Sequence, residues 1–168
     1  MKSMLPGMRI IKSVVSVFIV LVIAHILNYS TPFYACIACV IVMKSNPDAS
    51  LVFGKGRMIG TLLGGCIGGV FILITGFLSV DASSLLYILL ISLALLVDFM
   101  IAKGLKIGEY ATSMSAILVL SVLITHNSDV ATMLRYMISR TVETMIGIIV
   151  AILVNRYLSL ATIEKHQE

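Results

Sequence analysis

The chain has 168 residues, of which 60% are hydrophobic and only 12% are charged, and its mean hydropathy is +1.11. Average soluble domains carry about 25% charged residues. The formal charge of +4 comes from cations that lie between apolar runs and form no basic face, which argues against a nucleic-acid partner. The composition also argues against a soluble enzyme and a secreted disulfide scaffold.

Two long stretches contain no charged residue, one from Ser13 to Met43 and one from Met58 to Val80. Each exceeds the roughly 20 apolar residues that a helix needs to cross a bilayer. The chain is therefore predicted to be an integral membrane protein, with the lipid bilayer as its surroundings.

The apolar runs and the short polar connections between them predict an all-α protein with six transmembrane helices in a single domain, residues 1–168. Ser30-Thr31-Pro32 and Asn46-Pro47 indicate helix starts, with a polar cap before a proline in the first turn. The helix that begins at Pro47 carries Lys55 and Arg57 before it becomes the third span. The spans are expected at about residues 10–27, 33–43, 58–78, 85–102, 110–125 and 137–158.

The positions of lysine and arginine predict the orientation of the chain. With the N-terminus in the cytoplasm, ten of the twelve cations fall on the cytoplasmic side, as the positive-inside rule requires. Arg135 and Arg140 then lie at the outside. We therefore expect both termini in the cytoplasm. The ten cytoplasmic cations are Lys2, Arg9, Lys12, Lys44, Lys55, Arg57, Lys103, Lys106, Arg156 and Lys165.

A short pattern occurs twice, at the start of the third and of the sixth span. Arg57-x-x-Gly-Thr61-x-x-Gly64 is repeated as Arg140-x-x-Glu-Thr144-x-x-Gly147. Three spans per repeat would make the two halves cross the membrane in opposite directions. A 3+3 inverted repeat is a common plan in secondary transporters, with the site near the repeat interface.

Glycines at four-residue spacing make one face of the third span nearly flat. Gly60, Gly64 and Gly68 lie on that face, where another backbone can approach closely. The face is predicted to pack within the protomer or across a homodimer. Alternatively, it lines a permeation path or slides during alternating access.

Four ionisable residues within or next to the spans have both a structural and a functional interpretation. Arg57 is either an anchor that extends to the cytoplasmic headgroups or a binding residue. Arg140 and Glu143 are close enough along one helix to form a structural ion pair. Asp98 either reaches the interface, pairs with Arg57 or Arg156, or carries a proton.

The sequence contains no Ser-His-Asp pattern, no H-E-x-x-H and no phosphate-binding loop. We therefore expect no enzymatic activity and no cofactor. Cys36-x-x-Cys39 lies in an apolar run without a second ligand pair, so we expect no metal site. These two cysteines and Cys66 are predicted to be small buried apolar side chains.

Several motifs in this order resemble the aromatic acid exporter family, which is related to the fusaric acid resistance (FUSC) proteins. They are the two repeated patterns above together with Gly7-Met8-Arg9-x-x-Lys12, Asn46-Pro47 and Val154-Asn155-Arg156. The resemblance implies a six-span domain in a bacterial plasma membrane that exports aromatic or other organic acids. It extends to plant malate channels, whose six-span subunits pair around an arginine-lined path. Because many members carry a cytoplasmic helical domain and this chain ends at Glu168, we expect a short form that self-associates, preferably as a dimer.

The leading hypothesis is a transporter that exports small organic anions. Arg57 and Arg140 would attract a carboxylate, and Thr61 and Thr144 would donate hydrogen bonds to it. Glu143 or Asp98 would couple protons to transport. The alternatives are a passive anion channel of the same fold and a membrane subunit or scaffold that needs a partner protein.

Overall fold

The structure is a computed structural model that describes residues 7–81, 83–125 and 130–164. Lys2, Lys165 and Ala82 in the predicted turn lie outside the described residues. Every regular element in the described part is an α-helix, as predicted. The helices are α1 (Met8–Ile26), α2 (Phe33–Val42), α3 (Pro47–Phe77), α4 (Leu85–Gly104), α5 (Glu109–Thr125) and α6 (Val130–Glu164).

Each predicted span overlaps one helix, but the helices differ in whether they are long enough to cross a membrane. Helices α1, α3, α4 and residues Leu134–Leu158 of α6 are long and apolar enough to cross. Helix α2 has 10 residues and therefore rises about 15 Å, half of a hydrocarbon core. Helix α5, with 17 residues, rises about 25 Å.

The two predicted helix starts have different outcomes. The Asp48 N–H donates to Asn46 Oδ1 at 3.0 Å, which confirms Asn46 as the cap of α3. At α2 the predicted hydroxyl cap is wrong, because Pro32 itself occupies the cap position and provides no side-chain acceptor. The N–H of Tyr34 instead donates to Glu143 on α6.

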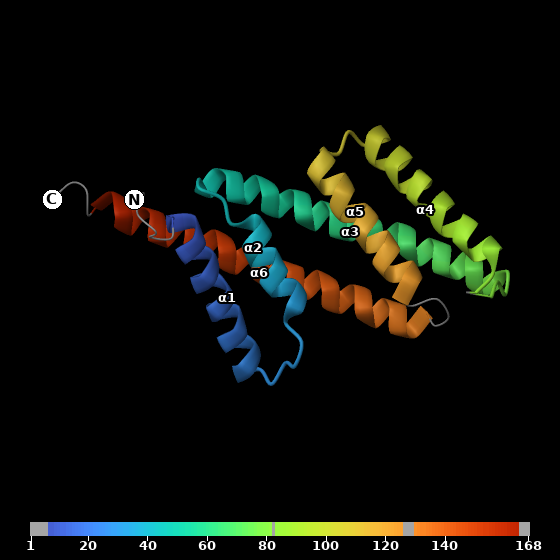
Figure 1. Cartoon of the computed structure of the whole chain (residues 1–168), viewed down its shortest axis with the longest axis horizontal. Helices are drawn as coiled ribbons and strands as arrows, with labels where there is room; N and C mark the ends of the chain where they lie inside the picture. The colour runs from blue at the N-terminus through green and yellow to red at the C-terminus, as the bar shows by residue number, and fades with distance from the viewer. Residues whose placement is uncertain (1–6, 82, 126–129, 165–168) are drawn as a thin grey trace, which may run out of the picture. The chain divides into compact units, whose positions relative to one another are not determined.

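The chain divides into two compact units. One contains residues 1–55 and 142–168 and is called the terminal unit; the other, residues 56–141, is called the central unit. Helix α3 passes from the terminal unit into the central unit after Lys55, and α6 passes back after Thr141. Helices α1 and α2 form a hairpin in the terminal unit, and α4 and α5 form one in the central unit (Figure 1).

In the terminal unit, small residues bring helices into close contact. Gly147 on α6 lies against the backbone carbonyl of Ala35 on α2, where a Cβ atom would overlap that oxygen. The Cys39 thiol of α2 lies 3.3 Å from the Gly147 carbonyl oxygen. Gly54 of α3 faces Ile148 of α6 in the same unit.

In the central unit, the glycine face of α3 packs on α5. Cβ atoms at Gly60 and Gly64 would overlap the carbonyl oxygens of Ala111 and Ser115, respectively. Gly68 meets Val122 one turn further on. Beyond this contact lies a buried apolar cluster, which consists of Ile67, Phe71, Ile72, Ala94, Leu118, Val119, Val122 and Leu123.

Large apolar side chains also cover the outside of both units. Phe18 on α1 is 66% exposed and Phe77 on α3 is 90% exposed. The prediction that all three cysteines are buried is partly wrong. Cys39 is buried, but Cys36 is half-buried and Cys66 lies on the exposed outer surface. Such surfaces are unfavourable in water but match the hydrocarbon of a bilayer.

Candidate functional site

Arg57 lies in the interior of the central unit. Its side chain is 7% exposed, and Nη1 donates to Met114 Sδ on α5 at 3.3 Å. The guanidinium also interacts electrostatically with the hydroxyl of Tyr110. Its Nε is buried and has no hydrogen-bond partner among the described residues. Within the central unit, Arg57 is therefore not a surface anchor, because its side chain is held against α5.

The other α3 residues that the sequence predicted for the site or for helix packing lie near Arg57 on the same helix face. Thr61 is buried one turn after Arg57, and Gly60 and Gly64 admit the α5 backbone at the turns between them. The absence of a Cβ at these glycines allows α5 to approach closely enough for Met114 to meet the guanidinium.

Asp98 on α4 is fully buried in the central unit. Its Oδ1 accepts a hydrogen bond from Ser115 Oγ on α5, whereas Oδ2 has no hydrogen-bond partner in the described part of the chain. Of the alternatives for Asp98, the one in which its side chain reaches the interface is therefore wrong. A buried carboxyl with one unsatisfied oxygen is costly when charged and less costly when it carries a proton.

The second repeated motif is divided between the units, because Arg140 belongs to the central unit whereas Glu143 and Thr144 belong to the terminal unit. The Arg140 guanidinium lies 5.5 Å from the ring centroid of Tyr136, one turn earlier on α6. Thr144 is buried. Helix periodicity placed these residues on one face, but it did not indicate that the motif is divided between two compact units.

Glu143 holds the start of α2 in the terminal unit. Its Oε1 accepts from the Tyr29 hydroxyl at 2.7 Å, and its Oε2 accepts from the Tyr34 N–H at 3.0 Å. A negative charge at a helix N-terminus is favoured by the aligned peptide dipoles. Glu143 therefore serves as the N-terminal cap that α2 lacks in its own sequence.

The terminal unit also contains a buried polar network that the sequence hypothesis did not include in the site. Lys12 Nζ donates to Asn155 Oδ1 at 3.0 Å. Asn155 Nδ2 donates to the Lys44 carbonyl at 2.9 Å and to Ser50 Oγ at 2.8 Å. Lys12 is 5% exposed, and Asn155 and Ser50 are fully buried.

Two features of the sequence could have indicated this network, although they were not used. Lys12, Ser16, Val20 and Ala24 follow one another at four-residue spacing, and all four are buried. A lysine in register with small and apolar residues therefore points inward. The motifs around Lys12 and Asn155 also carried the family resemblance, although they are 143 positions apart and only the fold brings them together.

No three His, Cys, Asp or Glu side chains gather as metal ligands would within residues 7–81, 83–125 and 130–164. The buried polar groups of both units are instead cations, single carboxylates, hydroxyls and amides. This set of groups suits the binding of an anion or of a proton.

Four helices able to cross a membrane and extensive apolar outer surfaces define the class as a multi-pass helical membrane protein. The fusaric acid resistance protein-like family model matches residues 17–154. The chain belongs to this family, which confirms the resemblance to FUSC proteins seen in its motifs. Membership indicates a role in membrane transport or resistance. No curated protein and no solved structure matches the chain.

Proposed function

We propose that this chain exports small organic acid anions, aromatic acids in the first place, across a bacterial plasma membrane. It acts as a transporter, without catalysis, metal or cofactor. The observation that carries the proposal is the state of Arg57. Among the described residues, this buried guanidinium has a hydroxyl and a weakly accepting sulfur as partners, and its Nε has none, so an anionic ligand would supply the stronger, charged acceptor that it lacks.

The residues near Arg57 suit a carboxylate with a ring. An arginine binds a carboxylate through two parallel hydrogen bonds, and Thr61 on the same helix face is a further donor. Tyr110 and Met114 provide an aromatic and a polarizable surface. Arg140 and Thr144 would have the corresponding roles on α6.

Proton coupling is assigned to Asp98 rather than to Glu143. Both oxygens of Glu143 accept hydrogen bonds that hold the start of α2, so its charge has a structural use. Asp98 is fully buried, and one of its oxygens has no hydrogen-bond partner among the described residues. A passive anion channel is the alternative, and it requires the arginines but no titrating carboxylate.

We further propose that the chain crosses the membrane six times with both termini in the cytoplasm. If the short helix α2 did not return the chain to the cytoplasm, Lys44, Lys55 and Arg57 would lie outside, contrary to the positive-inside rule. Because α2 alone is too short to cross the membrane, the non-helical connections on either side of it would span the rest of the distance.

The proposed homodimer must use a face other than the glycine face. Because α5 already covers Gly60, Gly64 and Gly68 within the central unit, that face cannot also receive a second copy. The molar mass of the purified protein, corrected for bound detergent, tests the dimer.

The transport proposal is tested by flux of radiolabelled 4-hydroxybenzoate in sealed liposomes, with and without a pH gradient. Saturable, gradient-dependent flux is expected, and Arg57→Gln should reduce it at least about tenfold, because a charge-assisted hydrogen bond contributes roughly 1.5–3 kcal/mol. Arg156→Gln, which alters an exposed arginine, is the matched control and should leave flux unchanged. Equal flux in both variants at equal protein content would refute the site.

Orientation is tested by thiol labelling in a background with Ala at the three natural cysteines. An impermeant reagent added outside should label Asp81→Cys and leave Ser45→Cys and Gly104→Cys unlabelled; all three positions are exposed. Outside labelling at Ser45→Cys would mean that α2 does not return the chain to the cytoplasm.

A further inference from the structure

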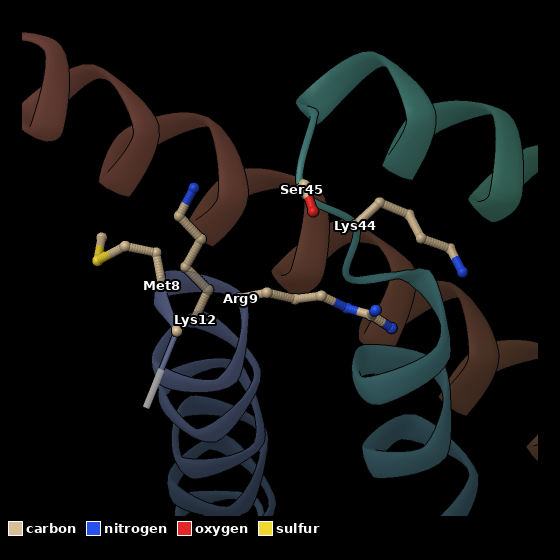
Figure 2. A pocket seen from close by; sticks show the side chains of 6 residues that line it. Met8, Arg9, Lys12, Lys44 and Ser45 are labelled. Carbon is tan, nitrogen blue, oxygen red and sulfur yellow. The ribbon is translucent and has the colours of Figure 1, made fainter. Parts of the chain in front are cut away.

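A small cavity opens in the terminal unit at the start of α1. Its volume is about 300 Å³, and it is lined by Gly7, Met8, Arg9, Lys12, Lys44 and Ser45. Three of these six residues are cations and none is acidic. In Figure 2 the Lys12 side chain points toward α6, Ser45 lies on the segment between α2 and α3, and the side chain of Lys44 extends away from Lys12. Gly7, Met8, Arg9 and Lys12 precede the segment that the family model matches.

The N-terminus of α1 forms part of the cavity wall, and it lacks the groups that usually satisfy a helix start. Gly7 occupies the cap position, no side chain caps the helix, and the first turn contains no acidic residue. Free N–H groups and the positive end of the helix dipole attract anions at such a position. Among the described residues, no atom lies within 4 Å of a Cβ placed at Gly7.

Lys12 is the second and independent indication of an anion. The side chain is 95% buried, since only 5% of it is exposed. Its ammonium group has three donors, and in the described structure one of them is used, on the neutral amide oxygen of Asn155. Because Asn155 donates to Lys44 O and Ser50 Oγ, the orientation of its amide is fixed. Within the described residues the hydrogen-bond partner of this buried cation is neutral, and an anion in the cavity would supply a counter-charge.

Arg9 and Lys44 add positive charge without competing for the same space. Arg9 donates through Nε to the Met43 carbonyl at 3.1 Å, and this contact does not use its two Nη groups. The Lys44 ammonium lies 3.8 Å from the centroid of the Phe53 ring. Lys44 therefore contributes positive charge at longer range, and its backbone forms part of the cavity wall.

The apolar rim of the cavity shows what kind of anion fits. Met8 lines the cavity and is itself exposed, and Ile11, Phe18 and Val22 continue its side of α1 as exposed apolar residues at helical spacing. A headgroup in the cavity would thus have a path for an acyl chain along α1. Basic pockets between transmembrane helices commonly bind anionic lipid headgroups.

We propose that the cavity at the start of α1 binds the phosphate of an anionic phospholipid, with Lys12 as its buried anchor and the α1 N-terminus, Arg9 and Ser45 as further donors. The acyl chain lies along the exposed face of Ile11, Phe18 and Val22. This site is separate from the proposed Arg57 site and does not depend on the identity of the transported acid.

The test is native mass spectrometry of the full chain in nonionic detergent, titrated with phosphatidylglycerol, phosphatidylcholine or inorganic phosphate. One phosphatidylglycerol should be retained at least about tenfold more tightly than phosphatidylcholine. Lys12→Met and Ser45→Glu should each weaken this binding about tenfold or more, because each removes or opposes a charge-assisted contact. Lys103→Met, at an exposed position in the last turn of α4, is the matched control and should have no effect.

Ser45→Glu keeps the test decisive if Lys12→Met does not fold, because Ser45 is an exposed residue between helices. Unchanged retention in Ser45→Glu would overturn the proposal. So would tighter binding of inorganic phosphate than of phosphatidylglycerol, which would indicate a site for free phosphate. Displacement of the lipid by 4-hydroxybenzoate would assign the cavity to the transported acid and would also overturn it.

Discussion

The terminal and central units share a helix plan but differ in their interiors. Each contains a helix hairpin, and each brings a glycine of a long helix against a backbone carbonyl of the second hairpin helix. In the terminal unit the pair is Gly147 and Ala35, and in the central unit it is Gly64 and Ser115. The two glycines end the two copies of the repeated motif, so the same local sequence produces the same close contact.

One position within the motif explains a large part of the difference. The residue after Arg57-x-x is Gly60, which lets the α5 backbone come close, whereas the residue after Arg140-x-x is Glu143, which reaches the start of α2. Helix α5 carries its own acid, Glu109, in its first turn, and α2 carries none. The missing charge of α2 is thus supplied by a different helix.

The units also differ in how they satisfy buried polar groups. In the terminal unit Asn155 joins Lys12, Ser50 and the Lys44 carbonyl. In the central unit Arg57 Nε and Asp98 Oδ2 have no hydrogen-bond partner among the described residues. Because unsatisfied buried groups are rare and costly, the central unit is where an anion or a proton has most to contribute.

The largest expected effect is that of Asn155→Leu on the terminal unit. Leucine has a branched shape like that of asparagine but leaves the buried Lys12 ammonium without its partner, so unfolding in detergent should become easier by about 3 kcal/mol. Adding Lys12→Met should restore part of this loss, because the uncompensated charge disappears with it. If the single variant is as stable as wild type, the network does not hold the unit together.

The second-largest loss of stability is expected when either motif glycine is replaced by alanine, and the loss should be similar in both units. Gly64→Ala and Gly147→Ala place a Cβ against a carbonyl oxygen, which should cost about 1–3 kcal/mol. Gly76→Ala is the control, because no described residue lies within 4 Å of its Cβ position. Thermal unfolding followed by size-exclusion chromatography measures all three. Sensitivity at only one of Gly64 and Gly147 would break the parallel between the units.

Glu143→Gln should destabilise by about 1 kcal/mol, the value of a charge at a helix N-terminus in a partly buried position. Glutamine can keep both contacts by presenting its oxygen to the Tyr34 N–H and its amide to the Tyr29 hydroxyl. The variant therefore removes mainly the charge. Glu109→Gln at the exposed start of α5 should cost less, about 0.3 kcal/mol. The reverse order in the same unfolding assay would contradict the capping role of Glu143.

Asp98→Asn should change stability by no more than about 1 kcal/mol, because asparagine can still accept from Ser115 and need not ionise. Its effect should appear in transport, as anion flux that no longer follows a pH gradient. Glu143→Gln should retain the gradient dependence. Flux that ignores the gradient in the wild type as well would favour the channel.

The sequence by itself determined the helices and the membrane. Long uncharged runs have only one low-energy backbone form in hydrocarbon, which is the helix, and Asn46-Pro47 marked one of their starts because capping is local. The motifs were enough to indicate the FUSC family. The burial of Lys12 was readable from its four-residue register with Ser16 and Val20.

Only the tertiary structure decided which polar residues meet. Lys12 and Asn155 are 143 positions apart, and Tyr29 and Glu143 are 114 apart, so no local pattern pairs them. The cap of α2 was assigned to Ser30-Thr31 because local rules consider only neighbouring residues, whereas its acceptor comes from α6. Helical periodicity identifies the face on which a side chain lies. The helix that packs against that face depends on long-range contacts, and those contacts decide whether the side chain finds a partner or awaits a ligand.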